Sequence, residues 1–232
     1  YVGYRNPGLL ARAAVTVDHI SGGRFELGIG GGWHEWEAAA FGYYFPGVGA
    51  RLDMLDEAAG LIRSLYANDR TTHDGEYFRT EHASMVPGPV DGTMPIWIGG
   101  VGERRTLRIV AEHATGWNAA YISPEEFGRL GRILDQHCEA IGRDPAEIER
   151  SINVMFDLGR DEASLRAQWG DMWERVEGGS LHGTPEQAVE RILEYHEHGA
   201  DMLNIAVRAP LDPEIVEAYL TETVPAVRAA VG

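Results

Sequence analysis

The stretch "MPIWIGGVGERRTLRIVAEHATGWNAAYI", residues 94–122, decides the fold class. Residues 94–100 form a short, continuous apolar run, which is typical of a strand buried in a parallel sheet. A helical pattern follows over 102–114, and a second strand pattern over 116–122. Strand, helix and strand in this order are the unit from which parallel α/β sheets are built.

The same alternation continues on both sides of this unit. Further strands are predicted at 24–30, 148–159 and 201–209, and helices at 6–23, 34–41, 50–67, 123–142, 162–176, 183–200 and 212–231. Residues 70–80 read as a hairpin with Asp74-Gly75 at its turn. The pattern fits an open doubly wound sheet or a (β/α)8 barrel, and five strands are too few to close a barrel.

The composition excludes several functions. The chain of 232 residues has a net charge of −16, and its 20 basic residues are all arginine. This charge repels nucleic acid and anionic membrane surfaces, and the lack of lysine excludes Schiff-base chemistry and a P-loop. No apolar run is long enough to span a membrane, and no secretory signal is present. The single cysteine, Cys138, lies in a helical pattern as a packed residue, and a reducing cytoplasm is the expected compartment.

The first of two glycine segments is "LGIGGGWHEWE", residues 27–37. A dinucleotide fingerprint needs a third glycine where Trp33 stands, so a Rossmann site is not predicted. The glycines instead allow backbone to approach a flat ring, with Trp33, His34 and Trp36 as pocket walls. The alternative is that both tryptophans are core residues at a helix start. No spacing in this segment fits a metal site.

The second glycine segment is "IWIGGVGERRT", residues 96–106. Three glycines follow a buried strand and lead into a helix that begins with Arg104 and Arg105. Free N–H groups, the positive end of a helix and a guanidinium favour the binding of an anion such as phosphate. The alternative is a tight turn with surface arginines.

Together these segments resemble the luciferase-like monooxygenase superfamily, and within it the F420-dependent oxidoreductases. The resemblance rests on the joint order of "SGGRFELGIGGGWHEWE" (21–37) and "PIWIGGVGERRTLR" (95–108) and extends over nearly the whole chain. It implies a (β/α)8 TIM barrel in which residues 1–232 form one partial domain. That domain would comprise the fourth to eighth strands with their helices and the hairpin near 70–80, the first three strands being missing.

The resemblance also assigns residues to a cofactor. The phosphate would lie against the loop after the fifth strand, which comprises Gly99, Gly100, Val101 and Gly102, with Arg104 as its charge partner. The ring system would border Gly31, Gly32, Trp33, His34 and Trp36. One branch of the family, the sugar-phosphate dehydrogenases, has a glutamate acid where this chain has Trp33, so that chemistry is not expected here.

These observations predict a redox enzyme that transfers a hydride between coenzyme F420 and a small organic substrate. Imidazole exchanges protons near neutral pH, so His34 is the predicted catalytic residue, as a proton donor or as a contact to developing charge. Two alternatives stay open: an FMN-dependent monooxygenase that works with a reductase, and a non-catalytic cofactor-binding fragment. The resemblance implies a homodimer.

Overall fold

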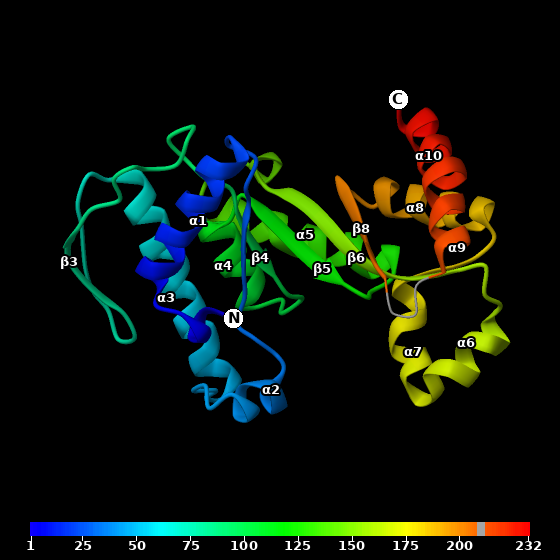
Figure 1. The fold of residues 1–232 in the computed structure, drawn as a ribbon, viewed down its shortest axis with the longest axis horizontal. Helices are drawn as coiled ribbons and strands as arrows, with labels where there is room; N and C mark the ends of the chain where they lie inside the picture. The colour runs from blue at the N-terminus through cyan, green and yellow to red at the C-terminus, as the bar shows by residue number, and fades with distance from the viewer. Residues whose placement is uncertain (208–211) are drawn as a thin grey trace. The chain divides into compact units, whose positions relative to one another are not determined.

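The computed structural model describes residues 1–207 and 212–232, which divide into two compact units. The first unit comprises Tyr1–Trp117 and Gln136–Ile148, and the second comprises Asn118–Asp135 and Glu149–Gly232. Helices alternate with strands along the chain (Figure 1). Three strand pairs are parallel: 27–29 with 96–98, 155–158 with 180–183, and 151–155 with 202–206. The predicted α/β class is confirmed.

The first unit is built on a parallel strand pair. Its elements are α1 (Pro7–Ser21), β1 (Leu27–Ile29), α2 (Glu35–Ala40), α3 (Val48–Ala67), β2 (Thr71–Asp74), β3 (Arg79–Ala83), β4 (Ile96–Gly99) and α4 (Thr106–His113). In the register of β1 and β4, Leu27 lies opposite Ile96 and Ile29 opposite Ile98. These four side chains are buried together with apolar residues of α3 and α4, while α1 lies beside α3 (Figure 1).

Local signals set the ends of α1 where the sequence predicts them. The Asn6 side chain accepts hydrogen bonds from the N–H groups of Gly8 (2.9 Å) and Leu9 (3.3 Å), and Pro7 occupies the first helical position. Gly22 ends the helix with φ of 69°, a left-handed conformation that glycine adopts without strain.

The predicted hairpin is formed by β2 and β3, which pair antiparallel. Asp74 lies opposite Arg79, and the Gly75 N–H donates to the Phe78 carbonyl at 3.1 Å. The Glu57 carboxylate of α3 accepts the N–H groups of Tyr77 (3.1 Å) and Phe78 (2.7 Å) and so ties the hairpin to this helix.

The second unit is centred on β6, which pairs in parallel with both β7 and β8. Its elements are β6 (Glu149–Leu158), α6 (Glu162–Trp169), α7 (Trp173–Val176), β7 (Ser180–Gly183), α8 (Pro185–Glu197), β8 (Met202–Ala206), α9 (Pro213–Ala218) and α10 (Val224–Val231), while β5 (Gly116–Ala120) and α5 (Pro124–Ala140) have residues in both units. The sequence did not predict β7. Residues 208 and 209 of the strand predicted at 201–209 lie outside the described residues.

Two predicted helices of this unit are interrupted. The helix predicted at 162–176 ends at Trp169 because Gly170 adopts φ of 53°, and it resumes as α7. The last helix contains a π-helical turn at Tyr219–Thr223, just before Pro225. Proline has no N–H to donate to the preceding turn, and a wider turn accommodates this loss.

Candidate functional site

The structure brings the two glycine segments together. β1 and β4 are adjacent and parallel, so the loops that follow Ile29 and Ile98 leave the sheet at the same edge. A Cβ atom built on Gly30 would lie 3.8 Å from the carbonyl oxygen of Gly99. This edge is the carboxyl end of the strands, where α/β proteins bind their ligands.

The loop after β4 folds tightly around the buried Thr106 side chain. A Cβ on Gly100 would lie 2.9 Å from Thr106 Cγ2, and a Cβ on Gly102 would lie 2.7 Å from Thr106 Oγ1. Gly100 also has φ of 136°, and its carbonyl accepts the Trp117 indole N–H at 2.8 Å. Both positions therefore require glycine, and the loop backbone stays free of side chains at the start of α4.

The two arginines at the start of α4 have different roles. Arg105 forms an ion pair with Asp53 of α3 and donates to the Gly49 carbonyl at 3.0 Å, so its charge is already engaged. Arg104 is exposed and forms no ion pair with any described residue. No side chain caps the N-terminus of α4, and within the described part of the chain the N–H groups of Val101 and Gly102 have no acceptor. Arg104 and these N–H groups are available to an anion.

The glycines of β1 and of the loop after it fall into two groups. A Cβ on Gly28 would meet no atom within 4 Å, so this face of β1 is open. Gly31 and Gly32 instead pack against protein. A Cβ on Gly31 would lie 3.2 Å from Leu52 Cδ2, and Gly32 has φ of 73° with its Cβ position 2.8 Å from the Tyr1 ring.

An arginine that the sequence did not single out holds this loop. Arg51 Nε donates to the Gly31 carbonyl at 3.0 Å, and its Nη1 donates to the Pro46 carbonyl at 2.6 Å. Its guanidinium also lies 4.0 Å from the centre of the Phe45 ring. These contacts fix the loop conformation, and no spacing in the sequence indicates them.

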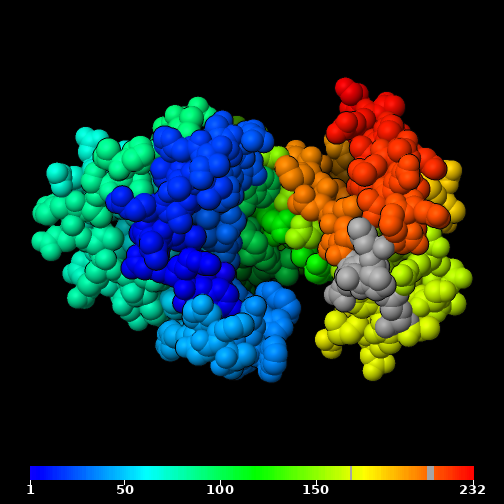
Figure 2. Space-filling view, viewed as in Figure 1, coloured from blue at the N-terminus to red at the C-terminus, as the bar shows by residue number. Residues whose placement is uncertain are grey.

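Two exposed tryptophans flank a histidine beyond this loop. Trp33 is 84% exposed and Trp36 is 77% exposed, so the alternative that they are core residues is wrong. The His34 ring meets both edge-on, with centroid distances of 4.7 Å to Trp33 and 6.1 Å to Trp36. The segment that contains α2 lies on the surface of the first unit (Figure 2). The three rings form an accessible aromatic platform.

The hydrogen bonding of His34 defines its tautomer. His34 is the N-cap of α2, and its Nδ1 accepts the Glu37 N–H at 3.0 Å. In the neutral ring the proton is therefore on Nε2, which can donate a hydrogen bond outward. Protonation of Nδ1 would break the cap and would place a cation at the positive end of α2. Nε2 is therefore the ring nitrogen that His34 can offer to a ligand.

A cluster between α3 and α4 combines metal-ligand residue types that no sequence motif indicates. Potential ligand atoms of Asp56, Glu112 and His113 lie within 4.8 Å of one another. Arg108 donates to both carboxylates at 2.6 Å, and His113 Nε2 lies 2.8 Å from Asp56. Burial raises the pKa of Asp56, but the hydrogen bonds from Arg108 and His113 outweigh burial and hold the pKa below 3.8. A guanidinium thus provides the positive charge, and the cluster acts as an ion-pair network between the helices.

Comparison with known proteins identifies the family. The sequence profile of luciferase-like monooxygenases matches residues 1–179. An F420-dependent glucose-6-phosphate dehydrogenase of Nakamurella multipartita is 34% identical over 162 residues, which cover 68% of this chain and 47% of the relative. A pyrimidine monooxygenase of Stutzerimonas stutzeri is 28% identical over 167 residues, which cover 70% of this chain and 45% of the relative.

A solved structure supports the same fold. An F420-dependent secondary alcohol dehydrogenase, in complex with an F420-acetone adduct, superposes with a TM-score of 0.83 at 20% identity, covering 96% of this chain and 76% of that one. This likeness confirms the predicted luciferase-like barrel class.

The chain spans 39–47% of the length of the curated relatives it matches. Among the described helices, none combines the length and apolar character needed to cross a bilayer. The chain belongs to the luciferase-like monooxygenase family.

Proposed function

We propose that the chain is part of an F420-dependent oxidoreductase that acts on a small organic molecule. The observation that carries the proposal is the placement of two glycine loops at the ends of adjacent parallel strands, with Gly30 beside Gly99. The Nakamurella multipartita relative and the superposed structural neighbour are both named as F420-dependent dehydrogenases. When bound, F420 would supply the hydride chemistry, and the protein would orient cofactor and substrate.

The loop after β4 would hold the cofactor phosphate. Gly99, Gly100, Val101 and Gly102 would offer backbone N–H groups, and Arg104 would supply the charge. The fit is supported by the tight packing of the loop around Thr106, which requires glycine at positions 100 and 102 and so keeps side chains off the loop backbone. It is also supported by the uncapped start of α4, which directs a positive partial charge at the same place.

The loop after β1 would border the ring system. Gly31 and Gly32 would set the course of the backbone, while Trp33, His34 and Trp36 would form the wall. The open face beside Gly28 and the exposure of both tryptophans leave room for a planar group. Because Trp33 stands where a glutamate acid would serve a sugar-phosphate substrate, we do not propose that substrate class.

His34 would act as a hydrogen-bond donor through Nε2 to charge that develops during hydride transfer. His34→Asn and His34→Ala separate this role from helix capping, because asparagine is a good N-cap and alanine is not. We expect both variants to lose turnover, and only His34→Ala to lose stability, by about 1 kcal/mol. Full turnover in His34→Asn with unchanged F420 affinity would exclude the catalytic role.

The second candidate is an FMN-dependent monooxygenase that works with a reductase, and one relative is named as a monooxygenase. Titration of the purified chain with F420 and with FMN, followed by absorbance and tryptophan fluorescence, decides between them. Binding of F420 at least tenfold tighter than FMN supports the proposal, and the reverse order supports the alternative. Binding of either cofactor without turnover would indicate a non-catalytic cofactor-binding protein.

Three further features belong to the same proposal. Residues 1–232 would form part of a single barrel domain, the enzyme would act in the cytoplasm, and it would assemble as a homodimer. The resemblance of the glycine segments to the F420-dependent branch supports the first and third features. The single, buried Cys138 supports the second, because reducing compartments disfavour disulfide frameworks.

A further inference from the structure

A pocket in the first unit lies at the opposite end of β4 from the glycine loops. It has a volume of 220 Å³ and opens between the C-terminal part of α3, the chain before β4 and the C-terminal end of α4. Ile96, the first residue of β4, lines it, whereas Gly99 at the other end of this strand begins the phosphate loop. The pocket is therefore separate from the site proposed for the cofactor.

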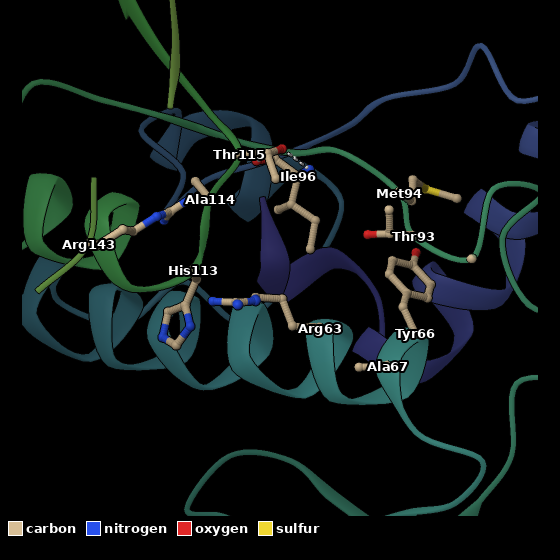
Figure 3. A pocket seen from close by; sticks show the side chains of 11 residues that line it. Arg63, Tyr66, Ala67, Thr93, Met94, Ile96, His113, Ala114, Thr115 and Arg143 are labelled. Atoms are coloured by element: carbon tan, nitrogen blue, oxygen red, sulfur yellow. Dashed lines mark hydrogen bonds between the residues drawn. The ribbon is translucent and has the colours of Figure 1, made fainter. Parts of the chain in front are cut away.

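The floor of the pocket is apolar. Met94 and Ile96 are each 2% exposed, and Ala114 is fully buried, so the floor is part of the core. The Tyr66 ring forms one side (Figure 3), and its hydroxyl donates to the Ala11 carbonyl at 3.3 Å. Such a floor favours the apolar body of a ligand.

Two guanidinium groups form the opposite side. Arg63 comes from α3 and Arg143 follows α5, and their guanidinium groups point toward one another across the end of α4 (Figure 3). Arg63 donates through Nη1 to the Glu112 carbonyl, and Arg143 donates through Nη1 to the Ala111 carbonyl at 2.8 Å. These bonds hold both groups in place and leave further N–H donors on each.

The charges around the pocket are not balanced locally. Arg143 Nε is paired with Glu147 at 3.1 Å, but within the described residues Arg63 has no carboxylate partner. His113 also lines the pocket, and its Nε2 is held by Asp56. As with Arg104, no described carboxylate pairs with Arg63, and Arg63 is one of the residues that line this pocket. The remaining N–H donors of Arg63 face the cavity, where they can bind one negatively charged group.

We propose that this pocket binds a small apolar monocarboxylate. The carboxylate would lie between Arg63 and Arg143, and the apolar body would lie over Met94, Ile96 and the Tyr66 ring. The volume corresponds to that of about seven water molecules, which is enough for a ligand of the size of benzoate. A single negative charge fits better than a dianion, because Glu147 and the negative end of α4 lie beside the two arginines.

The test is a calorimetric titration of the purified chain with benzoate, benzamide and inorganic phosphate. Benzamide has the shape of benzoate without its charge, and phosphate has charge without an apolar body. We expect benzoate to bind at least tenfold more tightly than either probe. Equal binding of benzamide, or no binding of benzoate at millimolar concentration, would overturn the proposal.

Variants locate the binding. Arg63→Met should lower the affinity for benzoate at least tenfold. Arg132→Met, which removes an exposed charge from α5, should leave this affinity unchanged. Ala67→Phe should abolish binding, because Ala67 lines the pocket from an exposed position where a larger side chain fills the space without disturbing the core. Unchanged benzoate affinity in both Arg63→Met and Ala67→Phe would place the binding elsewhere and refute the assignment.

Discussion

The packing of the loop after β4 around Thr106 gives a quantitative prediction for Gly102→Ala. The new Cβ would lie 2.7 Å from Thr106 Oγ1, whereas ordinary contacts begin at 3.4 Å. Overpacking of this kind costs about 1–3 kcal/mol. Replacing glycine also reduces the entropy of the unfolded chain, which returns about 0.4–1 kcal/mol. The net loss of stability should be about 0.5–2 kcal/mol.

A double-mutant cycle with Thr106→Ala isolates this contact. Without Oγ1, the nearest remaining atom of residue 106 is Cβ at 3.4 Å, an ordinary contact distance. In that background Gly102→Ala should be neutral or slightly stabilising, so the coupling free energy should be about 1–3 kcal/mol. Urea unfolding followed by circular dichroism measures each corner of the cycle.

A matched control is Gly28→Ala, because a Cβ on Gly28 meets no atom within 4 Å. It should not reduce stability. Coupling below about 0.5 kcal/mol between positions 102 and 106 is within the range of independent sites. That result would refute the conclusion that Thr106 forces glycine into the loop.

Three further predictions concern other contacts. Asp56→Asn should lower the unfolding free energy by about 1 kcal/mol at pH 7, because the ion pair with Arg108 is lost. The folded pKa of Asp56 lies below 3.8, so the difference in unfolding free energy between the wild-type chain and the variant should shrink as pH falls below that value. Glu57→Gln should speed hydrogen exchange of the Phe78 amide in the hairpin several-fold, and unchanged exchange would exclude the tie to α3. Trp36→Ala should change the unfolding free energy by less than about 0.5 kcal/mol because the ring is exposed, while it weakens F420 binding at least threefold; a large stability loss would indicate a structural role.

The sequence predicts the repeating strands and helices well because their signals are local. All five predicted strands are present, and within the described residues each strand is shorter than predicted. The sequence missed β7 because Ser180–Gly183 has only four residues, three of which are polar or glycine, and the segment is a strand through its pairing with β6. The break after α6 depends on the backbone conformation of Gly170, which the helical pattern of its neighbours concealed.

In the candidate site, too, local features could be predicted from the sequence, whereas tertiary contacts could not. Glycine spacing located both loops, but their proximity depends on the parallel pairing of β1 with β4. Which arginine stays available depends on Asp53, a distant residue that engages Arg105 and leaves Arg104 without an ion pair among the described residues. The tautomer of His34 likewise depends on a backbone N–H within α2. Such partners are set by the tertiary structure and leave no periodic signal in the sequence.

The central claim is that Arg104 and the loop after β4 bind the phosphate of F420. The direct measurement is the affinity of the wild-type chain, Arg104→Gln and the control Arg132→Gln for F420 and for its phosphate-free deazaflavin core. Arg104→Gln should lose a charge-assisted hydrogen bond of about 1.5 kcal/mol, so its affinity for F420 should fall roughly tenfold. The affinity of the control Arg132→Gln for F420 should stay at the wild-type value. The phosphate-free core should bind all three proteins equally. Equal F420 affinity in all three proteins, or an equal loss for both ligands in Arg104→Gln, would contradict the account.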